Sequence, residues 1–180
     1  MHKRTRWFAL LVALIAATSV GVRAQATNPT PVPQQKPDFS SMSFLMGTWT
    51  CHQMLRGKDR PDTSTTALGM DGMYMVTQDE APPFDQYRTF PIHGMSYMTY
   101  DSMIKKWVSI GVDSAGNYGI TSSPGWQGNT IVWTGSYLDG SSSTDTVTKA
   151  SDTRTTDQSV TKDPSGKVTT STITCTKSGS

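Results

Sequence analysis

The sequence predicts an all-β protein, a single antiparallel up-and-down barrel of about ten strands. From Met46 onward, short segments rich in Thr, Val, Ile, Tyr and Trp alternate with Gly, Pro, Asn, Asp and Ser, which is typical of consecutive antiparallel strands. No stretch of about 11 residues or more has a helical period. About ten strands can form a sandwich or a barrel, and Cys51 and Cys175 favour the barrel. They fall on the first and last predicted strands, which become neighbours if the sheet closes or its ends are otherwise brought together.

The N-terminus has the pattern of a secretory signal peptide. A basic start at residues 1–6 precedes an apolar run from Trp7 to Val22, and Ala24-Gln25-Ala26 supplies the small residues of a cleavage site. An apolar run of about 16 residues is shorter than the roughly 20 that span a bilayer. We therefore expect cleavage of residues 1–26, a secreted or periplasmic location, and no membrane insertion after signal cleavage.

Removing this leader changes the charge of the protein. Four basic residues and no acid leave with it, so the formal net charge goes from +2 to −2. The remaining chain has no basic block, which makes nucleic acid and anionic membrane surfaces poor partners. About 154 residues remain, which is enough for one hydrophobic core.

The mature chain is expected to begin with a flexible segment and then form one domain. Residues 27–38 contain four prolines and little to bury, so we predict an extended, poorly ordered stretch there. The barrel domain is predicted at 39–180. Residues 38–45 (DFSSMSFL) suit one helical turn that leads into the first strand and plugs one end of the fold.

Ten strands are predicted from the alternation of side chains. Asp71-Gly72 suits a two-residue hairpin turn, and 164–166 (PSG) suits the last turn. More than half of residues 141–180 are Ser or Thr, as in some disordered tails, but alternation around Val147 and Val160 favours strands. The predicted strands are 46–55, 64–70, 72–79, 94–101, 106–113, 117–121, 129–137, 142–149, 152–162 and 167–177.

The two cysteines of the mature chain predict a disulfide. Export to an oxidising compartment favours a bond between Cys51 and Cys175, and two buried free thiols are the alternative. The bond would close a loop of about 125 residues, which chain-entropy arguments value at roughly 4–5 kcal/mol. It would also fasten the seam of a closed sheet and remove two exposed edges.

Several segments resemble a known group of barrels. Residues 47–49 (GTW) resemble the Gly-x-Trp signature of the calycins, which include lipocalins, fatty-acid-binding proteins and nitrobindin-like barrels. Together the segments are similar to an exported bacterial calycin-like family of domains of unknown function. They occur in the order 44–49 (FLMGTW), 100–108 (YDSMIKKWV), 112–116 (VDSAG) and 126–135 (WQGNTIVWTG).

The resemblance covers residues 44–177 and implies a lipocalin-like or nitrobindin-like barrel, without an established chemistry. Nitrobindin-like barrels bind haem through a histidine on a late strand. The mature histidines here are His52 and His93, and none follows. We therefore expect no cofactor.

Motifs for catalysis and metal binding are weak. Ser102-Met103-Ile104-Lys105 matches Ser-x-x-Lys but lacks the companion motifs of penicillin-recognising enzymes, so we interpret it as a turn. Asp139 and Asp145 are also explained as turn residues. A methionine-rich middle third suggests either a soft-metal site or flexible packing, and we favour packing. We predict no catalytic residue and no metal site.

The sequence favours a binding protein that holds a small amphipathic or hydrophobic molecule inside the barrel. Hydroxyl groups on both faces of 168–175 predict a partly polar interior, which suits an amphipathic ligand. Asp113 ends an apolar strand, and we expect it either in the cavity or in a turn. The alternatives are an envelope protein with a filled barrel, or an enzyme at the barrel mouth. The predicted wall residues are Met73, Met75, Tyr97, Trp107 and Trp133, together with Asp113.

Overall fold

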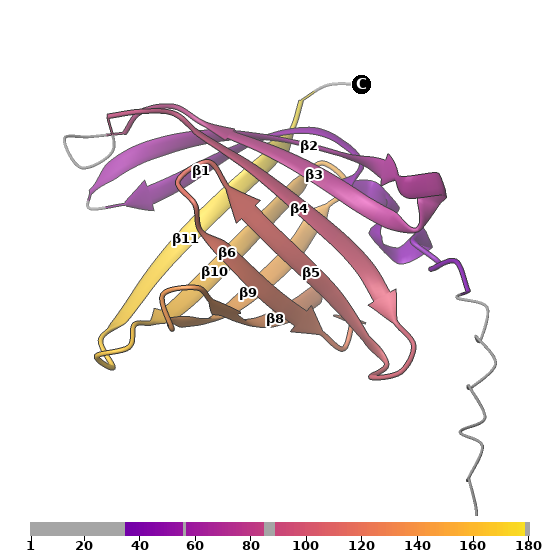
Figure 1. Cartoon of the computed structure of the whole chain (residues 1–180). Helices are drawn as coiled ribbons and strands as arrows, with labels where there is room; N and C mark the ends of the chain where they lie inside the picture. The colour runs from indigo at the N-terminus through magenta and orange to yellow at the C-terminus, as the bar shows by residue number, and fades with distance from the viewer. Residues whose placement is uncertain (1–34, 56, 85–88, 179–180) are drawn as a thin grey trace, which may run out of the picture. The chain divides into compact units, whose positions relative to one another are not determined.

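The computed structural model describes residues 35–55, 57–84 and 89–178, which fold as one antiparallel sheet (Figure 1). The predicted signal peptide (1–26) and residues 27–34 of the predicted flexible segment lie outside the described residues. Among the described residues, no helix is long and apolar enough to cross a membrane.

The sheet contains eleven strands within the described residues, and all ten predicted strands are present. The additional strand is β7, which has two residues. The strands are β1 (Gly47–Leu55), β2 (Lys58–Gly69), β3 (Tyr74–Ala81), β4 (Ile92–Asp101), β5 (Lys106–Asp113), β6 (Tyr118–Ser123), β7 (Trp126–Gln127), β8 (Thr130–Tyr137), β9 (Ser142–Ser151), β10 (Arg154–Lys162) and β11 (Val168–Lys177).

Strand β2 begins six residues earlier than predicted, and Pro61 lies within it. Proline cannot donate a ladder hydrogen bond, so it is confined to positions that are unpaired on one side. That condition holds here, because the β2–β3 ladder begins only at Thr63↔Glu80 whereas the β1–β2 ladder extends to Leu55↔Lys58. Residues before Thr63 therefore pair with β1 alone, and the strand tolerates the proline.

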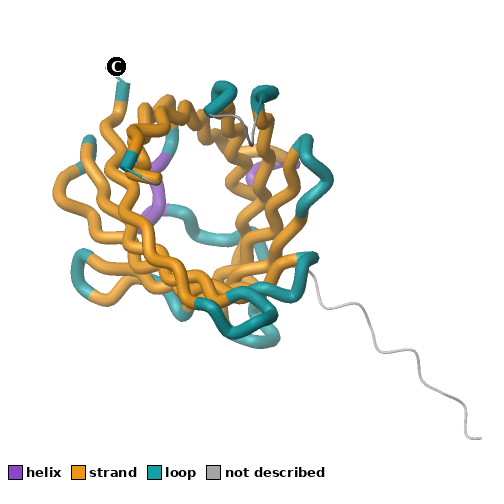
Figure 2. Tube along the Cα trace, turned by 90° about the vertical axis from the view of Figure 1, so that its left-hand side faces the viewer, coloured by secondary structure: helices purple, strands orange, loops and turns teal. Residues whose placement is uncertain are grey.

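The sheet closes into a barrel, as predicted. Consecutive strands pair as hairpins, and β1 pairs with β11, which joins the first and last strands of the chain. The pairing of β6 with β8 completes the ring (Figure 2). Cys51 and Cys175 are direct partners in the β1–β11 register, with their Cα atoms 4.0 Å apart, and they form the predicted disulfide. The bond therefore lies on the seam that closes the barrel.

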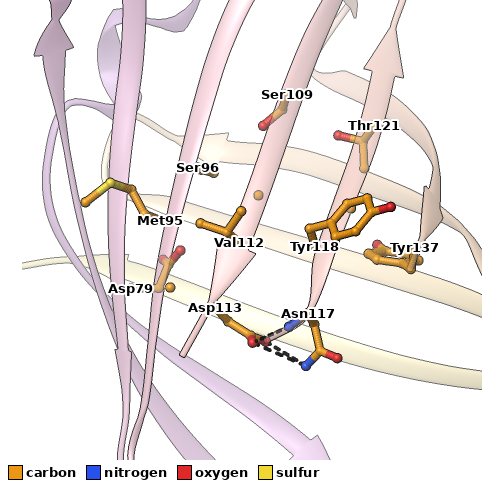
Figure 3. A pocket seen from close by; sticks show the side chains of 13 residues that line it. Asp79, Met95, Ser96, Ser109, Val112, Asp113, Asn117, Tyr118, Thr121 and Tyr137 are labelled. Atoms are coloured by element: carbon orange, nitrogen blue, oxygen red, sulfur yellow. Dashed lines mark hydrogen bonds between the residues drawn. The ribbon is translucent and has the colours of Figure 1, made fainter. Parts of the chain in front are cut away.

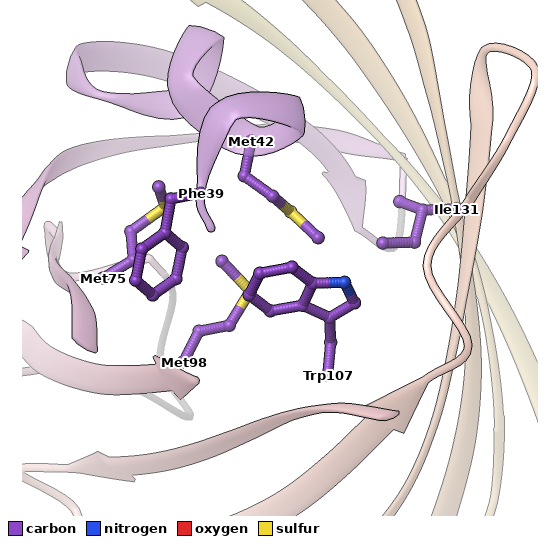
Figure 4. Packing of buried hydrophobic residues seen from close by; sticks show 6 residues of the cluster. All are labelled: Phe39, Met42, Met75, Met98, Trp107 and Ile131. Atoms are coloured by element: carbon purple, nitrogen blue, oxygen red, sulfur yellow. The ribbon is translucent and has the colours of Figure 1, made fainter. Parts of the chain in front are cut away.

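A short 3-10 helix, η1 (Ser40–Leu45), plugs one end of the barrel, as the sequence predicted. Its start is stabilised by the carboxylate of Asp38, which accepts a hydrogen bond from the Ser40 amide at 2.9 Å. Met42 is completely buried and points toward Trp107 (Figure 4). The plug cluster consists of Phe39, Met42, Met75, Met98, Trp107 and Ile131.

The β2–β3 connection differs from the two-residue turn expected at Asp71-Gly72. It is a short 3-10 turn, η2 (Met70–Gly72), in which three consecutive residues have positive φ angles: 49° at Met70, 57° at Asp71 and 77° at Gly72. Asp and Gly tolerate this left-handed region better than most residues. The position of the turn was therefore predicted correctly, but the connection between β2 and β3 is longer than the two residues expected.

A candidate ligand-binding cavity inside the barrel

The inward-facing side chains of the barrel leave a cavity of about 410 Å³. Successive residues of a strand point to opposite faces, so each strand contributes every second side chain to it. The residues that line the cavity are Leu45, Trp49, Cys51, Ser64, Thr66, Met75, Thr77, Asp79, Ser96, Met98, Ser109, Thr121, Trp133, Asp145, Val147, Thr155, Asp157 and Cys175.

One part of this lining is apolar and adjoins the plug. Met75 and Met98 are register partners on β3 and β4, and both also belong to the plug cluster. Trp49 is held in place by its indole N–H, which donates to the Leu45 carbonyl of η1 at 2.9 Å. Trp133 and Val147, from β8 and β9, pack against the same cluster. The plug therefore supplies the apolar floor of the cavity.

The three acidic residues of the lining, Asp79, Asp145 and Asp157, belong to two pairs of aspartates on separate hairpins. Asp79 on β3 lies diagonally from Asp62 on β2, because Asp79 pairs with Ser64. Asp157 on β10 lies diagonally from Asp145 on β9 in the same way, because Ser159 pairs with Asp145. Each pair places two carboxyl groups on neighbouring strands of the inner wall.

The environment of each pair raises the pKa of one of its members. Burial raises the pKa of Asp79 to about 6, and the nearby Asp62 carboxylate adds to the rise. Burial likewise raises the pKa of Asp157 to about 6, with Asp145 contributing. Both effects disfavour the charged form, through lost solvation and through repulsion between like charges.

Hydrogen bonding differs between Asp145 and Asp157. The buried Ser143 hydroxyl donates to Asp145 Oδ2 at 2.6 Å, and the Tyr137 hydroxyl lies 2.9 Å from Ser143 Oγ. Because Ser143 has a single proton and gives it to Asp145, Tyr137 is the donor to Ser143. In contrast, Asp157 Oδ1 is shielded from solvent and has no hydrogen-bond partner among the described residues.

A smaller pocket of about 320 Å³ adjoins the cavity on the β3–β6 side and shares Asp79, Ser96, Ser109 and Thr121 with it. Asp113 lines this pocket, where its carboxylate accepts hydrogen bonds from the Ala115 amide and from the amide and side chain of Asn117 (Figure 3). Burial tends to raise the pKa of Asp113, but these hydrogen bonds outweigh it and lower the pKa. Asp113 is therefore a turn residue at the rim.

Some of the predicted wall residues line the cavity, one belongs to the plug cluster, and others lie away from the cavity. Met75 and Trp133 line the cavity, and Trp107 lies in the plug cluster. Met73 lies in the connection between η2 and β3, where its carbonyl accepts the Thr99 hydroxyl, and it does not line the cavity.

Tyr97, predicted to line the cavity, is on the opposite face of β4, because both faces of this strand are apolar and alternation does not indicate which one points inward. It lies on the outer surface, where its ring contacts Tyr74 and its hydroxyl donates to Met95 Sδ. The cavity side of β4 is formed instead by Ser96 and Met98.

The acidic residues of the cavity were not predicted from the sequence. Asp145 was interpreted as a turn residue, but it lies within β9 and faces the interior. Asp139 does have a turn role, accepting hydrogen bonds from the amide and hydroxyl of Ser141. A usable signal was present, because aspartate is disfavoured in the middle of a strand. Asp79, Asp145 and Asp157 all occupy such positions.

The described residues do not assemble a metal site. No group of three His, Cys, Asp or Glu side chains within them is close enough to hold a metal ion. His52 and His93 are exposed and interact with Asp59 and Glu80, outside the cavity. Among the methionines of the middle third, Met75 and Met98 face inward, whereas Met103 is 92% exposed. The thioether groups of these methionines therefore do not all meet at one point, as a shared soft-metal site would require.

Comparison with solved structures places the fold among small β-barrels. The S-type phycobiliprotein lyase CPES from Guillardia theta matches with a TM-score of 0.55 and 12% identity, over 77% of this chain and 90% of that one. A redesigned beta barrel matches at a TM-score of 0.44 and 15% identity, over 77% and 96%. No family model and no curated protein matches the sequence. The structure and these comparisons show a closed antiparallel β-barrel fold.

Proposed function

We propose that this chain is a binding protein that holds a small amphipathic molecule inside its barrel. The observation that carries the proposal is the interior cavity of about 410 Å³, since small-molecule sites start at roughly 300 Å³. Its lining is apolar beside the plug and acidic or hydroxylated elsewhere. A molecule with one apolar and one polar end matches both parts.

Binding is better supported than the two alternatives. A filled structural barrel would not retain a cavity of this size. One feature of the cavity favours an enzyme, because carboxyl groups with a pKa of about 6, as at Asp79 and Asp157, suit acid–base chemistry. However, the two described histidines lie outside the cavity, so no imidazole base reaches it.

We also propose that the protein works outside the cytoplasm. The leader pattern at 1–26 and the Cys51–Cys175 disulfide support export, because disulfides persist mainly in oxidising compartments. Membership of the exported calycin-like family is supported by four sequence segments that occur in the same order as in that family: 44–49, 100–108, 112–116 and 126–135.

A fluorescent probe tests the cavity directly. N-phenyl-1-naphthylamine is apolar and uncharged at pH 7, and we expect it to become brighter on binding and to quench Trp49 or Trp133. Ser109→Phe places a ring in the cavity and should weaken binding at least tenfold. Ser122→Phe is the matched control, because Ser122 pairs with Val108 one residue along the same ladder and faces outward. Equal binding by the wild type and Ser109→Phe would place the probe outside the cavity and contradict the proposal.

Native mass spectrometry supplies a second test. Protein purified from its own host should carry a bound small molecule that is released on denaturation. A barrel that carries none, and that also fails to bind the probe, would favour the structural alternative.

A further inference from the structure

The charged side chains that line the cavity all have the same sign. They are Asp79, Asp145 and Asp157, and no Lys, Arg or His is among the residues of the lining. No ion pair connects any of the three to a described basic residue. Arg60 lies on the same inner face of β2 as Asp62, where it donates to Gln53, and it is not among the residues that line the cavity. Among the described residues, the lining of the cavity therefore carries only acidic groups.

One acceptor in this acidic lining lacks a donor. Asp157 Oδ1 is shielded from solvent and has no hydrogen-bond partner among the described residues. Buried polar atoms are nearly always paired, so an unpaired carboxylate oxygen on a cavity wall indicates a missing donor. Asp157 as a whole is only partly buried and lines the cavity, so a rotation of its carboxyl group would bring this oxygen to an N–H group of a ligand.

An aromatic side chain adjoins the same carboxylates. Trp133 and Asp145 are direct register partners on β8 and β9, and both line the cavity. Direct cross-strand partners have Cβ atoms about 4.5–5.5 Å apart. An indole face beside a carboxylate attracts a positive charge from two sides, since the ring quadrupole and the carboxylate both favour a cation.

The rest of the lining limits what kind of cation fits. A bare metal ion is disfavoured because the described residues contain no group of three metal-binding side chains. An organic cation needs only dispersed acceptors, and Met75, Met98 and Val147 would take its apolar part.

We propose that the ligand is an organic ammonium ion: a primary or secondary amine head held by Asp145 and Asp157, with an apolar tail directed at the plug. This inference rests on the proposed function and specifies its ligand class. The amine N–H groups donate to the carboxylates, including the unpaired Asp157 Oδ1. The tail lies on Met75, Met98 and Trp133.

Three probes with the same eight-carbon chain test the charge preference: octylamine, octan-1-ol and octanoate, each used to displace N-phenyl-1-naphthylamine. At pH 7.5 we expect octylamine to bind at least tenfold more tightly than octan-1-ol, and octanoate to bind most weakly. Asp157→Asn should abolish most of the preference for the amine. Glu80→Gln is the matched control, because Glu80 follows Asp79 but is 75% exposed on the outer face. It should leave the preference unchanged.

The pH dependence of the wild type tests the same point without any variant. Alkylamines remain protonated below about pH 9. The titratable groups near the two aspartates are Asp62, beside Asp79, and Asp145 and Tyr137, beside Asp157. Protonation of the carboxylates in the lining would remove their attraction for the ammonium ion. Octylamine should bind about tenfold more weakly at pH 5 than at pH 8, while octan-1-ol should bind equally at both.

The outcomes separate this inference from the proposed function. If neither the naphthylamine probe nor octan-1-ol binds, the proposed function is wrong. If both bind but octylamine has no advantage, or keeps its advantage in Asp157→Asn, only the ammonium assignment is wrong. Should Asp157→Asn fail to fold, Asp145→Asn and the wild-type pH series give the same decision.

Discussion

Asp79 on β3 and Asp157 on β10 line one cavity, although β2, β1 and β11 lie between their strands in the sheet. Closure of the barrel brings them to a shared interior although they are 78 positions apart in the sequence (157 − 79). Each has a carboxyl neighbour on the adjacent strand and a pKa raised to about 6. The interior is therefore expected to titrate near neutral pH.

The stability of the ligand-free protein should fall as the pH rises from about 4 to about 6. In this range the folded state holds protons on Asp79 and Asp157 that the unfolded state has released, so unfolding is favoured as protons become scarce. Asp79→Asn and Asp157→Asn should each raise the free energy of unfolding by about 1 kcal/mol at pH 8, after solvent screening, and change it little at pH 3. Urea unfolding at both pH values measures this, and Glu80→Gln is the control. An equal effect at both pH values would contradict the assignment.

Breaking the disulfide should destabilise the protein strongly. The bond closes a separation of 124 residues, and its removal should lower the free energy of unfolding by up to about 4–5 kcal/mol. Reductant should lower the melting temperature of the wild type but not that of the Cys51→Ala/Cys175→Ala double variant. Alkylation of two thiols in the mature protein without reductant would show that the bond does not form.

The plug should contribute substantially to stability. Met42 is completely buried between η1 and the barrel, so Met42→Ala leaves a void and should cost about 2–5 kcal/mol in thermal or urea unfolding. Met103→Ala, at a site that is 92% exposed, should change stability little. Similar values for the two variants would mean that η1 does not pack as described.

The position of the Tyr137 ring depends on the absence of a side chain at Gly119. A Cβ there would lie 2.5 Å from Tyr137 Cδ1, whereas a Cβ at Gly111, the register partner of Gly119, would come no closer than 3.9 Å to a neighbour. Gly119→Ala should cost about 1–3 kcal/mol and displace the Tyr137 ring from Ser143.

The titration of Tyr137 reports that displacement. Burial raises its pKa, and the carboxylates of Asp145, Asp157 and Asp139 add to the rise. Ultraviolet titration should show one tyrosine with a pKa closer to the ordinary value in Gly119→Ala. Gly111→Ala should titrate like the wild type, and a wild-type titration curve for Gly119→Ala would remove the proposed contact.

The amino-acid sequence by itself determined the strands, the closing disulfide and the plug, because these depend on local alternation, turn residues and the positions of two cysteines. Tyr97 shows where that reasoning stops: in a strand that is apolar on both faces, alternation cannot say which face points inward. Asp79, Asp145 and Asp157 show the second limit. An aspartate within a strand is unusual, but only closure of the sheet places all three around one cavity. The tertiary structure therefore decided the chemistry of the interior, because the pKa of a carboxyl group depends on burial and on neighbours that are distant in the chain.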